Sequence, residues 1–465
     1  MLNNTLLFWG FFFTVYALYW FVARTPQSKR VLLLGANAAF YASWDVRLLW
    51  VPVLLCYINH RGARAISAAA DDEPRRRRYL AITAAASVLL LIGFRYLDFL
   101  QDNLAASLAL FGVEGALTRV SIPPAVGISF MTFAALSYTL DVYRRGYEAQ
   151  PSFVKLLVSV SFFPITVAGP ITRPRELVPQ LEQAAGIEWR DVRCAFFLIA
   201  VGLFKKTIAD VLGVLVKDTY DGAAALDTFT AWAAAIGYVA QLYADFSGYA
   251  DIAIGAALLL GIKIPINFRL PLLAASPVEI WRRWHITLST WIRDYLFVSL
   301  GLRTPYRSLF LAWVIAGIWH GPSWTFFVWG AYQALLIVIT AFLTRRVRLS
   351  KDTMRRLYPA RWLLTFYSWV VGCVLFRAPT LERAGDVLVA MHTWQGRFLY
   401  DMFATMVLAV AAIVSGHLLD AAGLSGFPAR RSRLALGFWA VSIIVLLTFA
   451  LVVNPGSMSF IYAGF

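Results

Sequence analysis

The chain has 465 residues, of which 60% are hydrophobic and only 15% are charged, and it carries a formal net charge of +16. This composition excludes an ordinary soluble globular protein and is typical of a polytopic membrane protein. The positive charge does not indicate a nucleic-acid partner, because the arginines cluster in short segments between apolar runs, as they do in cytoplasmic loops of membrane proteins. Apolar runs near the roughly 20 residues that a spanning helix needs predict an all-α fold in the lipid bilayer.

The N-terminal half contains a series of apolar runs that predict helices. The run at 6–22 has no basic segment before it and no small-residue cleavage site after it, so we expect a retained first helix and not a signal peptide. A break at 43–45 separates two further helices, and Pro123 and Pro124 suit the start of another. The helices predicted in this half are 6–22, 31–44, 48–58, 79–97, 122–143 and 153–168, with an interfacial segment at 104–113.

Polar residues make the second half harder to divide into spans. Lys205 and Lys206 lie near the middle of the run at 193–216, so either that span is interrupted or the lysines snorkel to the interface. The run at 229–261 is one tilted span with an extra piece or two short spans, and a structured loop at 261–271 follows it. The later runs, 309–319, 324–344, 362–376, 403–418 and 434–453, bring the prediction to about eleven spans with a re-entrant middle.

Two of the five histidines lie in the central stretch between residues 276 and 332. A histidine at bilayer depth is costly and usually lines a cavity, a partner surface or an aqueous path. In WRRWHITLSTWIRDY at 281–295, a helical period places Trp281, Trp284, Leu288, Trp291 and Tyr295 on one face. The same period places Arg282, His285, Ser289 and Arg293 on a second face, roughly 125° away. This segment is therefore predicted to be an amphipathic helix at the interface or one that re-enters the protein interior.

His320 lies in GIWHGPSWTFFVWGAY at 317–332, where it closes an apolar run. Gly321 and Pro322 are expected to break the helix directly after it. A histidine near neutral pKa can take a proton from a hydroxyl and return it to a leaving group, as acyl transfer requires. Alternatively, His320 is a hydrogen-bonded core histidine and His285 belongs to a structural polar stripe. The other histidines, His60, His392 and His417, are assigned no role.

The polar string QLYADFSGYAD at 241–251 carries two carboxylates within an apolar run. Asp245 and Asp251 are about 240° apart on a helix, so they are not expected to form a carboxylate dyad unless the helix breaks at Gly248. They could orient a histidine, pair with the arginines of 281–293, mark an ion path or form buried ion pairs that fix the packing. The three cysteines form no metal or disulfide signature and are read as small buried residues.

Six strings in this sequence resemble the membrane-bound O-acyltransferase (MBOAT) family, and specifically its bacterial branch that includes the alginate O-acetyltransferase membrane subunit. They keep the family's order and lie mostly between residues 123 and 330, whereas 351–450 resembles the family only loosely. The resemblance implies one membrane domain over 1–465, with a ring of tilted helices around a thin central funnel. The strings are VGISFMTFAALSYTLDVYR at 126–144, FFPITVAGPITRP at 162–174, QLYADFSGYADIAIG at 241–255, WRRWHITLSTWIRDYLF at 281–297, GIWHGPSWTFFVWG at 317–330 and FIYAGF at 460–465.

The resemblance also implies site residues. His320 matches the family's intramembrane catalytic histidine, and His285 matches a second polar position near the floor of the funnel. Neighbouring polar residues are candidates for lining the tunnel; they are Arg282, Ser289, Asp245 and Asp251.

The function that the resemblance implies is O-acetylation of a secreted polysaccharide, alginate-like or another exopolysaccharide, by a protein of the bacterial inner membrane. Cytosolic acetyl-CoA would be the donor substrate, with no tightly bound cofactor and no metal, and a periplasmic or membrane-anchored acyltransferase would be the partner. D-alanyl transfer to teichoic acid from a carrier-protein thioester is the alternative within the enzyme class. From another class, a proton-coupled transporter or flippase would use Asp245 and Asp251 as proton relays.

Overall fold

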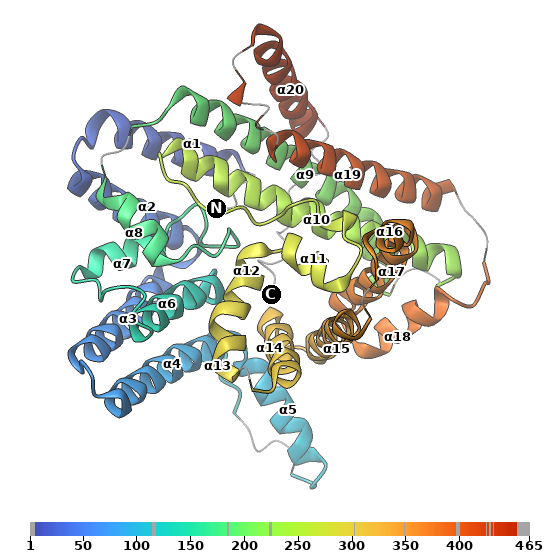
Figure 1. The fold of residues 1–465 in the computed structure, drawn as a ribbon, viewed down its shortest axis with the longest axis horizontal. Coiled ribbons are helices and arrows are strands. Elements are labelled where there is room, and N and C mark those ends of the chain that lie inside the picture. Colours follow the sequence, from blue (N-terminus) through green and yellow to red (C-terminus); the bar gives the residue numbers. More distant parts are fainter. Residues whose placement is uncertain are drawn as a thin grey trace. The chain divides into compact units, whose positions relative to one another are not determined.

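The computed structural model describes residues 5–113, 118–183, 186–222, 226–301, 303–347, 349–396, 400–424, 426, 429–430 and 432–452. Regular structure in these ranges consists of helices, without a strand, which confirms the all-α prediction (Figure 1). The chain divides into two compact units. The first contains the described residues up to Gly186 together with Leu260–Ile264, and the second contains Ile187–Leu259 and the described residues from Pro265 onward. The single domain over 1–465 stays a prediction.

The first unit begins with α1 (Leu6–Ala17), which continues into a π-helical turn, η1 (Leu18–Val22). Helix α2 (Pro26–Asp45) starts with a capping box, in which Thr25 and Ser28 satisfy each other's backbone N–H groups. A short 3₁₀ turn, η2 (Val46–Leu48), then leads into α3 (Trp50–Ala68), and the chain bends by 102° between the two helices. The predicted break is thus confirmed, and it lies at 46–49 instead of 43–45.

Three of the remaining helices of the first unit, α4, α6 and α7, pack against α3 (Figure 1). Helix α6 starts only at Ile128, because Gly127 before it has a left-handed backbone with φ of +72°. The predicted start at Pro123 and Pro124 is therefore wrong. The elements here are α4 (Glu73–Arg95), α5 (Leu97–Ala109), α6 (Ile128–Tyr143), α7 (Phe153–Val160) and α8 (Pro174–Glu182).

Helix α7 ends at Val160, eight residues before the predicted end at 168, because a buried asparagine holds the chain in turns beyond it. The Asn37 amide donates to the Val158 carbonyl at 3.2 Å, and its Oδ1 accepts from the Phe163 N–H at 2.9 Å. These bonds satisfy backbone groups that the helix would otherwise pair, so the helix stops.

The second unit is built on two continuous helices of 32 residues each, α9 (Trp189–Tyr220) and α10 (Thr228–Leu259), which lie side by side (Figure 1). Glycines allow the close approach: a Cβ at Gly202 would lie 2.6 Å from the Gly248 carbonyl oxygen. Helix α9 is continuous through Lys205 and Lys206, and of the two alternatives for 229–261 the pair of short spans does not occur. The run at 229–261 forms one helix, and Lys205 and Lys206 do not snorkel, since they are 1% and 4% exposed.

The second unit continues through short helices into a pair formed by α14 and α15, which approach closely at glycines. A Cβ at Gly317 would lie 2.4 Å from the Gly330 Cα. The helices after α10, apart from the 3₁₀ turn η3 (Pro271–Leu273), are α11 (Pro277–Arg283), α12 (Ile286–Trp291), the π-helix η4 (Ile292–Phe297), α13 (Val298–Leu300), α14 (Pro305–His320), α15 (Trp324–Arg346), α16 (Lys351–Arg356), α17 (Tyr358–Arg377), α18 (Leu381–Ala390), α19 (Tyr400–Leu424) and α20 (Arg433–Val452).

Four helices among the described residues are long and apolar enough to cross a membrane, and a fifth span is added if α2 and α3 count as one bent element. This agrees with a polytopic membrane protein. The predicted count of about eleven spans is not confirmed by this criterion, and the ring around a funnel stays a prediction. The string FIYAGF at 460–465 lies outside the described residues. The four helices are Glu73–Arg95, Trp324–Arg346, Tyr358–Arg377 and Phe403–Gly423.

Candidate active site

His320 is the last residue of α14, and its side chain is buried, with 2% of its surface exposed. The helix stops there for a local reason. Pro322 has no N–H to donate to an earlier carbonyl, and it pushes Gly321 into extended backbone, with φ of 178° and ψ of 162°. The next helix, α15, begins at Trp324 after Ser323, whose hydroxyl accepts from the Thr325 N–H. The predicted helix end at His320 is thus confirmed.

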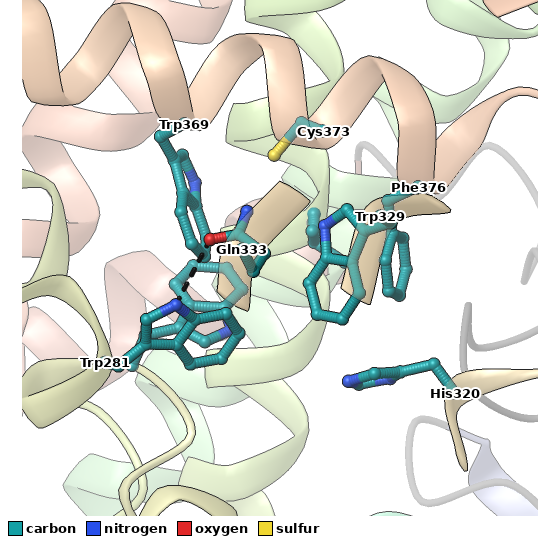
Figure 2. Close-up of a pocket in the computed structure, with 9 residues that line it drawn as sticks. Trp281, His320, Trp329, Gln333, Trp369, Cys373 and Phe376 are labelled. Carbon is teal, nitrogen blue, oxygen red and sulfur yellow. Dashed lines mark hydrogen bonds between the residues drawn. The ribbon is translucent and has the colours of Figure 1, made fainter. Parts of the chain in front are cut away.

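Aromatic rings surround the imidazole of His320. Trp329 meets it edge-on at a centroid distance of 4.9 Å, and Phe376 does so at 5.2 Å. Trp319, its neighbour in sequence, lies at 4.9 Å, and Phe326 stacks at 6.4 Å. Figure 2 shows the ring extending from its helix end below Trp329 and Phe376. These apolar neighbours therefore pack around the ring and restrict its orientation.

A cavity of about 10 Å³ adjoins His320. This is close to the space that one water molecule needs, so an acyl group can enter only if side chains move. One polar group on the wall is Gln333, which is 1% exposed and whose Oε1 accepts from the indole N–H of Trp281 at 3.3 Å (Figure 2). The lining residues are Leu242, Trp281, Trp284, His320, Trp329, Gln333, Trp369, Cys373 and Phe376.

His285 lies at a break between α11 and α12, where a single helix was predicted. Trp284 has extended backbone, and His285 has left-handed backbone with φ of +43° and ψ of 52°. The continuous amphipathic helix is therefore wrong, although the apolar face is confirmed, because all five of its side chains are buried. They are Trp281, Trp284, Leu288, Trp291 and Tyr295.

The break also removes His285 from the predicted polar face. Its side chain is completely buried, whereas Arg282 and Arg293 are exposed. Its Nδ1 lies 3.3 Å from Oδ1 of Asn267, which is itself 1% exposed. The ring of Phe246 meets the imidazole at 90°, with a centroid distance of 4.6 Å. A hydrogen bond and a perpendicular ring thus fix the orientation of this imidazole.

Trp319 lies near both histidines. Its indole is 6.5 Å from the ring of His285 and 4.9 Å from the ring of His320, measured between centroids. The residues of two separate sequence strings therefore meet at one indole inside the second unit.

The tunnel candidates lie in different surroundings. Arg282 is exposed, and Ser289 is half-buried and donates its hydroxyl to the Trp284 carbonyl at 3.4 Å. Asp245 and Asp251 form ion pairs with lysines of α9, at 3.1 Å to Lys206 and at 2.8 Å to Lys205. These contacts agree with the alternative that the two carboxylates form buried ion pairs, here with lysines of α9.

These ion pairs belong to a larger buried network that the sequence analysis missed. Lys205 also pairs with Asp420 of α19, which accepts from the Tyr243 hydroxyl at 2.5 Å, and Lys206 also pairs with Asp210. The spacing of Lys206 and Asp210 at i and i+4 is a signal for their contact. No local signal connects Lys205 with Asp420, because 215 residues separate them.

The other three histidines have hydrogen bonds that explain their burial or orientation without a reactive role. His60 donates from Nε2 to the Gln150 carbonyl at 2.9 Å. His417 donates from Nδ1 to the Ile413 carbonyl, and its Nε2 accepts from the Leu272 N–H at 3.3 Å. His392 donates to the Leu388 carbonyl and accepts from Tyr367.

Comparison with known proteins identifies the family of this chain. Residues 37–378 match the membrane-bound O-acyltransferase family, and the chain belongs to that family. It is therefore an O-acyltransferase of the multi-pass membrane type.

Relatives with three different activities are similar to this chain. A probable alginate O-acetylase of Azotobacter vinelandii is 35% identical over 87% of this chain and 83% of its own length. A peptidoglycan O-acetyltransferase of Helicobacter pylori is 33% identical over 84% of this chain and 80% of its own length. A teichoic acid D-alanyltransferase of Streptococcus thermophilus is 27% identical over 49% of this chain and 59% of its own length.

Proposed function

We propose that this protein moves acetyl groups from cytosolic acetyl-CoA to the outer side of the bacterial inner membrane for O-acetylation of a secreted polysaccharide. Relatives that cover more than four fifths of this chain are named for O-acetyl transfer to alginate or peptidoglycan, both of which contain sugars. The observation that carries the proposal is His320, a buried histidine at a helix end beside a small cavity in an O-acyltransferase.

The reaction needs a base for the attacking hydroxyl. In the proposed step, the His320 ring takes the hydroxyl proton while the oxygen attacks the carbonyl carbon of the acetyl thioester. The new C–O bond forms, the C–S bond breaks, and the proton passes to the sulfur that leaves as CoA thiol. The surrounding rings of Trp329 and Phe376 exclude water, which would otherwise hydrolyse the thioester. His285, whose ring also lies near Trp319, would support the reacting groups.

The donor and the acceptor are proposed to lie on opposite sides of the membrane. Arginines exposed at the end of α15 and in α16 would attract the phosphate-bearing donor to the cytosolic face; they are Arg345, Arg346, Arg355 and Arg356. The acceptor hydroxyl on the outer side would belong to the polysaccharide or to a periplasmic or membrane-anchored acyltransferase that passes the acetyl group on.

D-alanyl transfer remains the second candidate, supported by the similarity to the teichoic acid D-alanyltransferase of Streptococcus thermophilus. Its lower identity and coverage favour the acetyl reading. An assay of the purified protein distinguishes the two donors. Release of CoA thiol from acetyl-CoA supports acetyl transfer. If the protein consumes a D-alanyl carrier-protein thioester and no acetyl-CoA, D-alanyl transfer replaces acetyl transfer as the function. We do not retain the transporter, because the chain belongs to an acyltransferase family and both proposed relay carboxylates pair with lysines.

The test in cells compares acceptor O-acetylation in wild type, His320→Ala and His285→Ala at matched membrane abundance. Loss of a general base costs about 10²- to 10⁴-fold, so His320→Ala should reduce acetylation at least a hundredfold. His392→Ala is the matched control, since that histidine is exposed. Normal acetylation in His320→Ala would overturn the assignment.

A further inference from the structure

The backbone of His285 needs support from elsewhere in the fold. A residue other than glycine with left-handed φ costs of order 1–3 kcal/mol, and such a conformation persists only where its surroundings determine it. Here the support comes from the loop at 265–271, outside both flanking helices. The backbone N–H of Arg269 donates to the Arg283 carbonyl at 2.9 Å, which ties this loop to the end of α11.

Asn267 of this loop caps α12 from a distance. Its backbone carbonyl accepts from the Ile286 N–H at 3.0 Å, and its Oδ1 accepts from the Thr287 N–H at 3.1 Å. These are the first two N–H groups of α12, which have no partner inside the helix. The His285 side chain does not cap the helix itself. Asn267 therefore does the work that an N-cap residue usually does.

This capping determines which atom of the amide faces His285. The Thr287 N–H and the Thr287 hydroxyl, at 2.9 Å, both point to the same amide atom, and the backbone N–H can only donate. That atom must therefore be the carbonyl oxygen. The same oxygen lies 3.3 Å from Nδ1 of His285.

An amide oxygen can only accept a hydrogen bond, so Nδ1 of His285 must carry the proton that it donates. We propose that Asn267 is a positioning residue that holds neutral His285 in the Nδ1-protonated tautomer, with its lone pair on Nε2. The perpendicular ring of Phe246 opposes a ring flip that would exchange these positions. Nε2 then accepts a hydrogen bond from a hydroxyl, and it cannot donate one to the oxygen of a thioester.

The chemical meaning of this tautomer rests on the proposed function, but its existence does not. In acetyl transfer, His285 would orient the attacking hydroxyl through Nε2 while His320 takes the proton. An alternative in which His285 donates from Nε2 to the developing negative charge on the thioester oxygen is excluded for the neutral ring.

The direct test is solid-state NMR of the full-length protein in lipid bilayers, with ¹⁵N in the histidine rings. His285→Gln identifies the His285 signals by their loss. We expect a protonated Nδ1 and an unprotonated Nε2 in wild type, and a mixture of tautomers in Asn267→Ala. Asn267→Asp keeps an oxygen that accepts from both Nδ1 and Thr287, so it should keep the proton on Nδ1 even if Asn267→Ala accumulates poorly.

Asn37→Ala is the matched control. Asn37 is 3% exposed, and it likewise holds a turn through an Oδ1 that accepts a backbone N–H, that of Phe163, within the first unit. The Asn37→Ala substitution should lower protein abundance without changing the NMR signals of His285. A proton on Nε2 in wild type, identical signals in Asn267→Ala, or an equal change in Asn37→Ala would each overturn the proposal.

Turnover provides a second measurement. Partners that orient metal-bound histidines contribute about 10- to 100-fold to activity, and we expect Asn267 to act on His285 in a similar way. The kcat should therefore fall at least tenfold in Asn267→Ala with little change in KM, and it should recover in part in Asn267→Asp. If wild type transfers no acetyl group, the proposed function fails while the NMR result still decides the tautomer. If wild type is active and its Nε2 is protonated, only the role of Asn267 fails.

Discussion

His320 and His285 are both buried, yet the protein positions them by different means. Rings of Trp319, Trp329 and Phe376 enclose His320, which extends from a helix that its own sequence terminates. His285 lies where the backbone is left-handed, and the amide of Asn267 holds both the ring and the following helix. Packed rings surround the first histidine, and the amide of Asn267 holds the second.

The difference predicts different sensitivities. Apolar packing is non-directional and tolerates a change that conserves volume. A buried hydrogen bond is directional. If one partner is removed, the other stays buried with neither water nor protein to satisfy its donor or acceptor, which costs free energy. Substitutions around His320 should therefore act through volume, and those around His285 through the atoms that donate or accept.

The largest effect is expected from replacing each histidine by an amide of similar size. His320→Gln keeps much of the volume but cannot take a proton, so acetyl transfer should fall about 10²- to 10⁴-fold. Acetyl transfer by the His285→Asn variant should fall less, because asparagine tolerates left-handed backbone and can still accept a hydrogen bond. The rate of CoA thiol release by the purified variants measures both. An equal loss of rate in the two variants would contradict the different roles assigned to His320 and His285.

The next largest effect is expected from breaking the buried ion pairs of Lys205. Lys205 is 1% exposed and pairs with Asp251 and Asp420, so Lys205→Met leaves buried carboxylates without their cation. Breaking a buried pair in this way costs about 3–5 kcal/mol. The midpoint of thermal unfolding in detergent should fall strongly.

A double variant, Lys205→Met with Asp251→Asn, serves as the control for Lys205. It should recover part of the loss, because fewer uncompensated charges remain. Unchanged unfolding in the single variant would mean that the network adds nothing to stability.

A smaller effect is expected from moving the helix that carries His320. A Cβ at Gly317 would lie 2.4 Å from the Gly330 Cα, so Gly317→Ala forces α14 and α15 apart at a cost of about 1–3 kcal/mol. Acetyl transfer should fall while the ¹⁵N signals of His285 stay unchanged. Gly437→Ala in α20 is the control, since a Cβ there has no atom within 4 Å. Coupled changes at both histidines would show that they move as one body.

The smallest effects should separate packing from hydrogen bonding directly. Phe376→Leu keeps an apolar contact beside His320, and Thr287→Val removes one donor to Asn267 while keeping the backbone N–H that also donates to it. Each should cost about 1 kcal/mol of stability. Only Phe376→Leu should alter the ring environment of His320, which ring-current shifts in the NMR spectrum report. The reverse pattern would contradict the comparison.

Local signals predicted the parts of this protein that depend on neighbours in sequence. Apolar runs predicted a helical membrane protein, and Gly321 and Pro322 predicted the helix end at His320, because proline acts on the residues directly before it. The family strings indicated His285 and His320 as the candidate site histidines. Periodicity failed at 281–295, since the same spacing of aromatic residues is buried whether or not the helix breaks at Trp284 and His285.

Only the tertiary structure decided which distant groups meet. The loop carrying Asn267 was expected to be structured, but nothing in it indicated that its amide caps a helix 19 residues later and orients a histidine. Likewise, the partners of Lys205 became visible only when α9, α10 and α19 packed together. Sequence determines local backbone preference and membrane character through short-range sterics and hydrophobicity. The pairing of buried polar groups depends on long-range packing, because burial itself forces each such group to find a partner.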